Sequence, residues 1–474
     1  MRSSPHLPET ADKIDRIDLL VWKITAVAVL GSLMGQMDAT VVNVSLSSLA
    51  IDLHSSLAAI QWVTSGYLLA LALMLPLNAW LVGQIGAKSL YLWCFPIFTL
   101  SSALRGLAWS ANSLIGFRVL QGMSGGLMAP LAQMMMARAA GKHMARVLSY
   151  AAMPILLGPL LGPVLAGAIL QHASWRWLFL VNVPVGFLAI ALAIRFLPED
   201  RAEARPRDLD FAGFCLLSPA LVLFLYGVDH ISERIALTAL LVALVLLTVF
   251  VRLANRKGDH ALIDLQLFRG KAFSASVLTQ STLNGISFAG QMLIPIYLIR
   301  MCGDSPSMAG WLMAPLGLGM ICTYPKIGAL MQRFGYRTVA GGGAFLALAG
   351  TMPFLYLACY GMSLPLLLCA LFVPGMGLSA VGIPSITSAY ASVEKEHLPM
   401  ATTSLNIVQR LRGPTLTTLC ATFLGWRLGI ARQEMGITGA FTAAFMLLTL
   451  IHILLFVAAL RLPFYVEKRE RATV

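Results

Sequence analysis

The chain carries little charge for its length. Only 12% of its 474 residues are Asp, Glu, Lys or Arg and 58% are hydrophobic, whereas a soluble domain is usually about 25% charged. This leaves too little polar surface to cover several soluble domains. Apolar runs of about 20 residues, each long enough to cross a hydrocarbon core of about 30 Å as a helix, recur along the chain instead. Because these runs are continuous rather than alternating, they exclude a strand-built barrel and predict an all-α polytopic membrane protein.

Residue groupings that hold metals, cofactors or nucleotides are also missing from the sequence. The seven cysteines form neither a CxxC pair nor a cluster with histidine, and in apolar runs a free cysteine packs as a small hydrophobe. No glycine-rich run ends in the Gly-Lys-Ser/Thr of a phosphate loop. His452, in the last apolar run, has no acidic neighbour within one helical turn. We therefore expect no cofactor, no metal, no ATP-driven step and no enzymatic activity.

Breaks in the hydrophobic pattern predict fourteen membrane spans with both termini in the cytoplasm. Short cytoplasmic loops are rich in Lys and Arg, and with this orientation most of the 34 basic residues lie inside. The first twenty residues lack an apolar core, so we expect no cleavable signal peptide. The loop bias, rather than nucleic-acid binding, then explains the net charge of +13. The predicted outward segments hold Arg105, Arg176, Arg234, Arg300, Arg427 and Arg432. The predicted spans are 22–50, 60–82, 88–109, 112–138, 146–170, 177–197, 211–229, 235–253, 273–300, 306–331, 339–360, 364–390, 402–424 and 439–462.

Two short loops resemble each other and suggest an internal repeat. VGQIGAKSL (82–90) and MQRFGYRTV (331–339) each place a glycine two residues before a basic residue, as Gly86 with Lys88 and Gly335 with Arg337. Such a pair is also common in unrelated cytoplasmic turns, so this alternative stays open. Parallel repeats of six helices are the plan of one large transporter fold. The predicted organisation is a tail (1–21), a six-helix bundle (22–197), a linker (198–272) with two inserted helices (about 211–229 and 235–253), a second bundle (273–462) and a tail (463–474).

Several stretches resemble motifs of the major facilitator superfamily. LIGFRVLQGMSGG (114–126), which contains Arg118, Gln121 and Gly122, is similar to its arginine-containing motif, and LLGPLLGPVLAGAI (156–169) is similar to the Gly-Pro motif of its drug:proton antiporters. MDATVVNVSL (37–46) and SWRWLFLVNVPVGF (174–187) resemble the fourteen-helix branch. The resemblance implies a 6+2+6 architecture and alternating access. It also implies export of small molecules coupled to inward proton flow, by a multi-pass protein of the bacterial inner membrane that we expect to be a monomer.

Asp38 is the only acidic side chain well inside a predicted span, and Arg118 is a charge near the middle of another. A charge at that depth costs at least about 2.5–3.5 kcal/mol on insertion scales, so Arg118 should face the bundle interior and have partners. A guanidinium keeps its proton, whereas a carboxylate in a low-dielectric cavity can exchange one. We interpret Asp38 as the proton acceptor and Arg118 as its modulator. The alternatives are a permanently paired aspartate and an arginine that only packs.

Small residues line one face of the predicted span 146–170 and allow close helix packing. They are Gly158, Gly162, Ala166 and Gly167. Pro159 and Pro163 each remove a helix hydrogen bond and favour a kink, so we expect either a hinge or proton seal, or static packing. The family turn Gly-x-Leu-Ala-Asp-Arg-x-Gly-Arg is altered here, because Gly83 stands at the aspartate position and Gln332 at the equivalent place in the second half. We expect the charged cytoplasmic latch to be weakened or built otherwise.

Polar and aromatic residues inside the spans are candidates to line a substrate cavity. They are Asn43, Trp62, Tyr67, Asn284, Gln291, Asn406, Gln409 and Arg410. Arg118, Lys326, Arg410 and Arg412 outnumber Asp38 within spans. This surplus favours anionic or neutral substrates over lipophilic cations, unless Arg410 and Arg412 reach the interface. A proton-coupled or facilitative transporter of an organic anion, and a non-transporting membrane sensor, therefore remain alternatives to an exporter.

Overall fold

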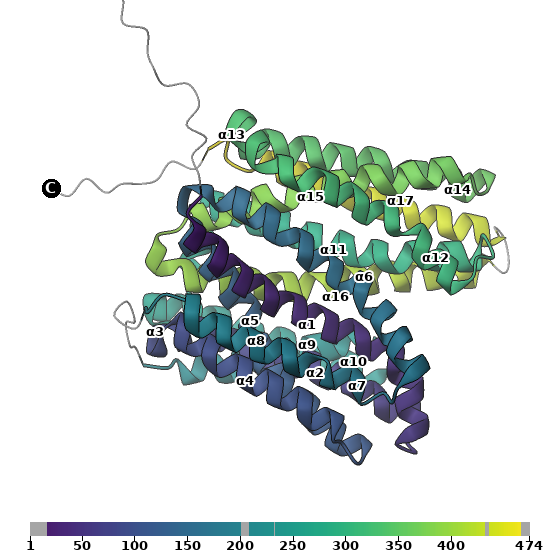
Figure 1. Ribbon diagram of the computed structural model, residues 1–474. Coiled ribbons are helices and arrows are strands. Elements are labelled where there is room, and N and C mark those ends of the chain that lie inside the picture. The colour runs from purple at the N-terminus through teal and green to yellow at the C-terminus, as the bar shows by residue number, and fades with distance from the viewer. Residues whose placement is uncertain (1–16, 201–207, 232, 432–435, 466–474) are drawn as a thin grey trace, which may run out of the picture.

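The computed structural model describes residues 17–200, 208–231, 233–431 and 436–465, and within these ranges all regular structure is helical. Long helices run side by side in Figure 1, with α13, α14, α15 and α17 (green to yellow) above α1–α5 (purple to blue), and α6 and α16 running between these groups. The first half comprises α1 (Leu19–Asp52), α2 (Leu57–Met74), α3 (Asn78–Ile85), α4 (Ala87–Gly106), α5 (Ala111–Ala140), α6 (Met144–His172), α7 (Trp177–Leu180) and α8 (Asn182–Phe196). Then come α9 (Phe211–Asp229) and α10 (Arg234–Lys257). The second half comprises α11 (Lys271–Arg300), α12 (Pro306–Leu312), α13 (Ala314–Thr351), α14 (Pro353–Tyr360), α15 (Leu364–Ala391), α16 (Leu398–Ala431) and α17 (Gly436–Leu460).

Helix ends and breaks follow local sequence. Ser110 begins α5 with a capping box, in which its hydroxyl accepts from the Ser113 N–H group at 3.1 Å and the Ser113 side chain accepts in return. Pro76 divides the predicted span 60–82 into α2, a short 3₁₀ turn and α3, since proline cannot donate a helix hydrogen bond. The predicted spans 306–331 and 339–360 are joined through α13, which kinks at Gly335.

Nine helical stretches in the described ranges are long and apolar enough to cross a membrane. One of them, Ser307–Tyr360, is 54 residues long and includes the kink at Gly335. Four further predicted spans coincide with α4, α5, α6 and α16, which are not among the nine. Buried polar residues such as Arg118 on α5 and Asn406 on α16 lower the hydropathy of two of these helices.

The apolar core lies in separate clusters, and the largest of them joins the two halves. One cluster draws only on α1–α8 and the loops between them, around Val63 and Phe179. Another lies wholly in the second half, around Tyr297 and Phe445. The joining cluster combines helices of both halves near the end of the bundle where α1 begins. The halves are thus packed together most extensively at that end.

Buried hydrogen bonds also connect the halves. Oε1 of Gln133 on α5 accepts from the Tyr390 hydroxyl at 2.7 Å and from Nδ2 of Asn406 at 2.9 Å. Nδ2 of Asn78 on α3 donates to the hydroxyl of Thr403 on α16 at 3.1 Å. One amide of α5 therefore binds two helices of the opposite half.

The paired helices α9 and α10 pack against each other, and α9 also contacts α2 and α16. Asp210, just before α9, accepts from Nζ of Lys257 at 2.5 Å and from the N–H groups of Gly213 at 2.9 Å and Leu262 at 3.1 Å. Burial alone would raise the pKa of Asp210, but these hydrogen bonds outweigh it and hold the pKa below its usual value. This carboxylate ties the start of α9 to the end of α10.

Candidate functional site

Asp38 lies near the middle of α1 with its side chain buried, and helices α6, α5, α8 and α2 pack around α1. A buried carboxylate needs hydrogen-bond donors on both oxygens to offset its desolvation. Oδ2 accepts from Nη1 of Arg118. Oδ1 accepts from Nη2 of Arg105 at 2.5 Å and from Nδ2 of Asn182 at 3.0 Å. The two oxygens are thus bound by different helices, α5 on one side and α4 with α8 on the other.

Arg118 is fixed by contacts with its own helix and with α2. Its Nη1 also donates to Oε1 of Gln121 at 2.8 Å, and its Nε donates to the Val63 carbonyl at 3.2 Å. Its guanidinium carbon lies 3.9 Å from the centre of the Tyr67 ring, a favourable cation–π arrangement. The arginine expected to need partners inside the bundle therefore has them.

Arg105 is a second buried cation of this cluster. It lies in the last turn of α4, where a cation is favoured by the helix dipole. Its Nη2 donates to the Ser102 hydroxyl at 2.9 Å, and its guanidinium carbon lies 4.3 Å from the centre of the Phe179 ring. From the sequence we counted Arg105 only as a charge of an outward segment and missed this contact, in which the side chain is fully buried against Asp38. Nothing in the sequence indicated the contact, because counting charges in loops does not show which helices lie against each other.

Small residues bring α5 and α6 against their neighbours beside this cluster. A Cβ on Gly122 would lie 2.5 Å from the Tyr67 carbonyl oxygen, so α5 and α2 touch through backbone. Along α6, a Cβ on Gly158 would lie 3.0 Å from Cβ of Gln36, and one on Gly162 would lie 2.0 Å from the hydroxyl of Thr40. The α6 glycines therefore contact α1 on both sides of Asp38.

Not every residue of the α6 motif makes a close contact. A Cβ on Gly167 would meet nothing within 4 Å, and Ala166 is buried in the core of the first half. The side chains of Pro159 and Pro163 lie outside what the structure describes. The close approach to α1 therefore comes from Gly158 and Gly162.

The turn between α3 and α4 is held by acids from the segment after α8. Gly86 has φ 79° and ψ 161°, a conformation almost restricted to glycine. Asp200 accepts from the N–H groups of Ala87 at 2.7 Å and Lys88 at 3.2 Å and lies 3.8 Å from the Arg138 guanidinium. The Lys88 ammonium donates to Glu199 at 2.9 Å. This turn, which has a glycine at position 83, is thus held by carboxylates from the segment after α8.

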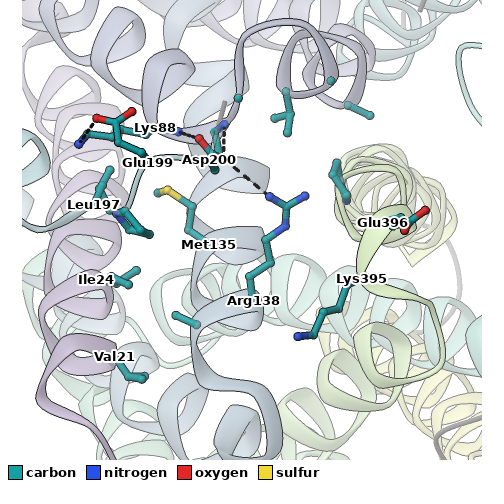
Figure 2. A pocket seen from close by; sticks show the side chains of 18 of the residues that line it. Val21, Ile24, Lys88, Met135, Arg138, Leu197, Glu199, Asp200, Lys395 and Glu396 are labelled. Carbon is teal, nitrogen blue, oxygen red and sulfur yellow. Dashed lines mark hydrogen bonds and ion pairs between the residues drawn. The ribbon is translucent and has the colours of Figure 1, made fainter. Parts of the chain in front are cut away.

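This turn borders a pocket of 1040 Å³ between the halves, which Figure 2 shows with Lys88, Glu199, Asp200 and Arg138 on one side. The opposite wall is formed by Lys395 and Glu396, in the short helix before α16. The lining carries both signs of charge in roughly equal number. The pocket therefore marks the place where the charged ends of the two halves meet.

The comparisons with known proteins agree with this arrangement. The sequence profile of the Major Facilitator Superfamily matches residues 28–411. This chain belongs to the Major Facilitator Superfamily. The fold predicted from the motifs is therefore confirmed at the level of the superfamily.

Several relatives of this facilitator are named multidrug resistance proteins. A multidrug resistance protein B homolog of Mycobacterium tuberculosis is 34% identical over 421 residues, which cover 87% of this chain and 78% of the relative. The putative multidrug resistance protein MdtD of Escherichia coli O157:H7 is 31% identical over 338 residues, 69% of each chain. The family and these names identify a membrane transporter rather than an enzyme.

Solved structures share the fold of the facilitator at low sequence identity. The human organic anion transporter MFSD10 has a TM-score of 0.62 at 16% identity, covering 92% of this chain and 99% of its own. The proton:xylose symporter XylE has the same TM-score and identity, covering 92% and 95%. These likenesses concern the helical architecture alone.

The candidate cavity residues of the facilitator do not form one cluster. Tyr67 is buried with its ring against the Arg118 guanidinium. Asn406 is buried where the two halves are in contact. Trp62 is 44% exposed and Gln291 is also exposed. The remaining candidates comprise the partly buried Asn284, Gln409 and Arg410, and Asn43, whose side chain lies outside the described part.

The cations around Asp38 include one beyond those expected, Arg105. Lys326 is exposed, and Arg412 is partly buried. Arg410 is close enough to the Tyr67 phenol to interact with it electrostatically. The cations nearest to Asp38 are Arg105 and Arg118, which give the carboxylate two positive neighbours.

Proposed function

We propose that this facilitator exports small molecules in exchange for protons by alternating access. Asp38 is the proton-exchanging group and Arg118 its fixed partner. The observation that carries this proposal is a single carboxylate, buried at the middle of α1 and bound by arginines from two other helices. Relatives named multidrug resistance proteins support export of drug-like or metabolite substrates.

The proposed architecture is fourteen spans in a 6+2+6 arrangement, with bundles at residues 22–197 and 273–462 and a monomeric protein in the bacterial inner membrane. Both termini lie in the cytoplasm, so the end of the bundle where the halves join is the cytoplasmic end. The matching backbone of Gly86 and Gly335 supports two equivalent halves. In this conformation the buried Gln133, Tyr390 and Asn406 contacts hold the cytoplasmic ends together.

The α6 glycines suit a role in conformational change. Gly158 and Gly162 contact Gln36 and Thr40. Those two residues lie on the face of α1 opposite to Asp38, so a shift of α6 against α1 would move the helix that carries the carboxylate. Gln121 and Gly122 would hold Arg118 and α2 in register while this happens. A proton falling through about 100 mV provides about 2.3 kcal/mol, which supports up to about a 50-fold substrate ratio per proton.

The test is transport in proteoliposomes with an imposed pH gradient and a panel of cationic, neutral and anionic solutes. We expect the wild type to move at least one solute against its gradient, and Asp38→Asn to abolish the dependence on the pH gradient. Asp52→Asn is the matched control, because Asp52 is an exposed acid at the end of the same helix. Undiminished coupling in Asp38→Asn would remove Asp38 from this role. Absence of any wild-type transport would favour a sensor.

A second candidate function is transport of an organic anion. It is favoured by the surplus positive charge of Arg105 and Arg118 over Asp38. An anionic substrate would be attracted to this cluster, whereas a lipophilic cation would be repelled. The same solute panel distinguishes the two candidates by the sign of charge that is transported.

A further inference from the structure

The two arginines that bind Asp38 are held very differently. Besides Asp38, Arg118 contacts a backbone carbonyl of α2, an amide on its own helix and an aromatic ring. Arg105 also contacts an aromatic ring, that of Phe179, but its other acceptor is only the Ser102 hydroxyl. Two of its nitrogens, Nε and Nη1, are buried without an acceptor among the described residues, against one of Arg118 (Nη2). If Asp38 lost its charge, Arg118 would keep most of its contacts. Arg105 would lose its one charged partner.

Only one of these two cations is needed to neutralise the Asp38 carboxylate. Arg118 alone neutralises Asp38, and Arg105 adds a second positive charge 2.5 Å from Oδ1. An uncompensated buried charge is costly. A cation this close to a carboxylate strongly favours its ionised form over its protonated form. Arg105 therefore opposes proton uptake by Asp38 as long as it stays in contact.

The helix that carries Arg105 is tightly packed against α7 and α8. A Cβ on Gly186 of α8 would lie 2.0 Å from the Thr99 hydroxyl of α4, and one on Gly106 would lie 2.8 Å from the Leu180 side chain of α7. Arg105 and Asn182, the two donors to Oδ1, both lie in this packed group. A movement of the group relative to α1 would free Oδ1 and leave Arg118 on Oδ2.

We propose that Arg105 is a positioning residue that controls when Asp38 takes up a proton. In this conformation it keeps Asp38 ionised, and the carboxylate accepts a proton only after α4, α7 and α8 separate from α1. The inference deepens the proposed function and rests on Asp38 being the coupling carboxylate. It assigns the timing of proton uptake to Arg105, which the motifs do not include.

The other titratable or charged groups around Asp38 are few. From α2, Tyr67 faces the cluster, and from α16, Arg410 interacts with the Tyr67 phenol. From α5 the charged group is Arg118, and from α8 the contacting group is the neutral Asn182. Within the described residues, no charged side chain of α6 or α7 contacts Asp38. Arg105 is thus the one nearby charge that a movement of α4 removes.

The test measures protonation of Asp38 without needing a substrate. Dicyclohexylcarbodiimide reacts with protonated carboxyl groups in apolar surroundings, and mass spectrometry of the full-length protein in lipid nanodiscs can follow the Asp38 adduct across pH. Arg105→Gln and Arg105→Met remove the charge, and Arg105→Lys keeps it as the matched control. We expect the neutral variants to raise the pH of half-maximal labelling by about one to three units, while Arg105→Lys stays nearer to the wild type. In transport assays the neutral variants should show the same alkaline shift of the pH profile.

The outcomes distinguish this inference from the proposed function. Equal labelling profiles in the wild type and both neutral variants would overturn it, even if proton-coupled transport is found. A labelling shift without any transport would leave the inference standing and contradict the exporter. Neutral variants that cannot be purified in folded form would also overturn it, because Arg105 would then be a structural requirement rather than a surplus charge.

Discussion

The two halves of this transporter contain the same turn, held by different chemistry. Gly86 has φ 79° and ψ 161°, and Gly335 has φ 78° and ψ 168°. Each glycine is followed two residues later by a basic residue, Lys88 or Arg337. This agreement in backbone conformation is stronger evidence for a repeat than the sequence pattern, because few residues other than glycine adopt these angles.

The segments that hold the two turns also correspond, but among the described residues only the first supplies a carboxylate. In the first half the carboxylate of Asp200, beyond α8, accepts two N–H groups at the start of α4. In the second half the Phe464 carbonyl, beyond α17, accepts from the Tyr336 N–H group at 2.9 Å. Arg337 donates to the Leu462 carbonyl at 2.6 Å, and within residues 17–465 as described it pairs with no acid. The halves thus share a backbone arrangement, while the first half depends on ionic contacts and the second on backbone carbonyls.

We expect the largest loss of folding stability from Gly335→Ala. A Cβ there would lie 2.5 Å from the Phe464 carbonyl oxygen, and the positive φ would be strained. Strain of about 1–3 kcal/mol and loss of a hydrogen bond worth about 1 kcal/mol together predict destabilisation of about 2–4 kcal/mol. Thermal unfolding of the purified protein in detergent measures it. Gly342→Ala is the matched control, because a Cβ there meets nothing within 4 Å. Equal losses in both variants would contradict a special role for this turn.

The next effect should come from Asp200→Ala, which leaves two N–H groups at the start of α4 without their acceptor. Loss of a helix cap and of a favourable charge at a helix N-terminus predicts about 1–2 kcal/mol of destabilisation. Asp200→Asn should cost less, since an amide oxygen can still accept. Both losses should shrink at high salt, unlike those of Gly335→Ala. A salt-independent loss in unfolding experiments would argue against an ionic latch.

A smaller effect should come from Arg337→Gln, which removes the guanidinium 4.4 Å from the centre of the Phe464 ring. The glutamine amide can still donate to the Leu462 carbonyl, so loss of a cation–π contact of about 0.5–1 kcal/mol predicts only a small decrease in unfolding temperature. Arg333→Gln offers a control on the same turn, since the contact of Arg333 among the described residues is with the neighbouring Phe334 ring. If the loss of stability in Arg337→Gln depended strongly on salt concentration, the turn of the second half would be held by ionic contacts as well.

The sequence allowed the helical fold, the superfamily and the residues of the buried cluster on α1 and α5 to be predicted. Apolar runs define the helices, and a charge such as Arg118 within a run requires a partner. The contact of Arg105 with Asp38 was missed because the two residues are 67 positions apart and on different helices. Asp200 was missed for the same reason, since the turn it holds lies 113 residues earlier. Contacts at such separations depend on how helices pack, which periodicity along one helix does not encode.

The side-chain oxygen of Gln133, which accepts from two residues of the other half, is a second example of contacts that the sequence does not reveal. Asn406 was expected to face a cavity because it is polar and lies within a span, yet its amide is buried against Gln133, 273 residues away. Tyr390 shares that acceptor. Polarity within a span therefore identified a residue that needs a partner. It did not show whether that partner is a substrate or a residue in the opposite half of the protein.

The smallest effect should come from Lys88→Gln. Its ammonium pairs with Glu199, whose side chain is 75% exposed, so water and salt screen the interaction. We expect no resolved change in unfolding temperature at 0.5 M salt and only a slight decrease at low salt, since screening removes what the pair adds (Debye length about 4 Å). A loss comparable to that of Asp200→Ala would mean that Lys88, rather than the capped N–H groups, carries the ionic part of the latch. The contrast between the halves would then rest on one side chain at the position that both repeats share, Lys88 in the first and Arg337 in the second.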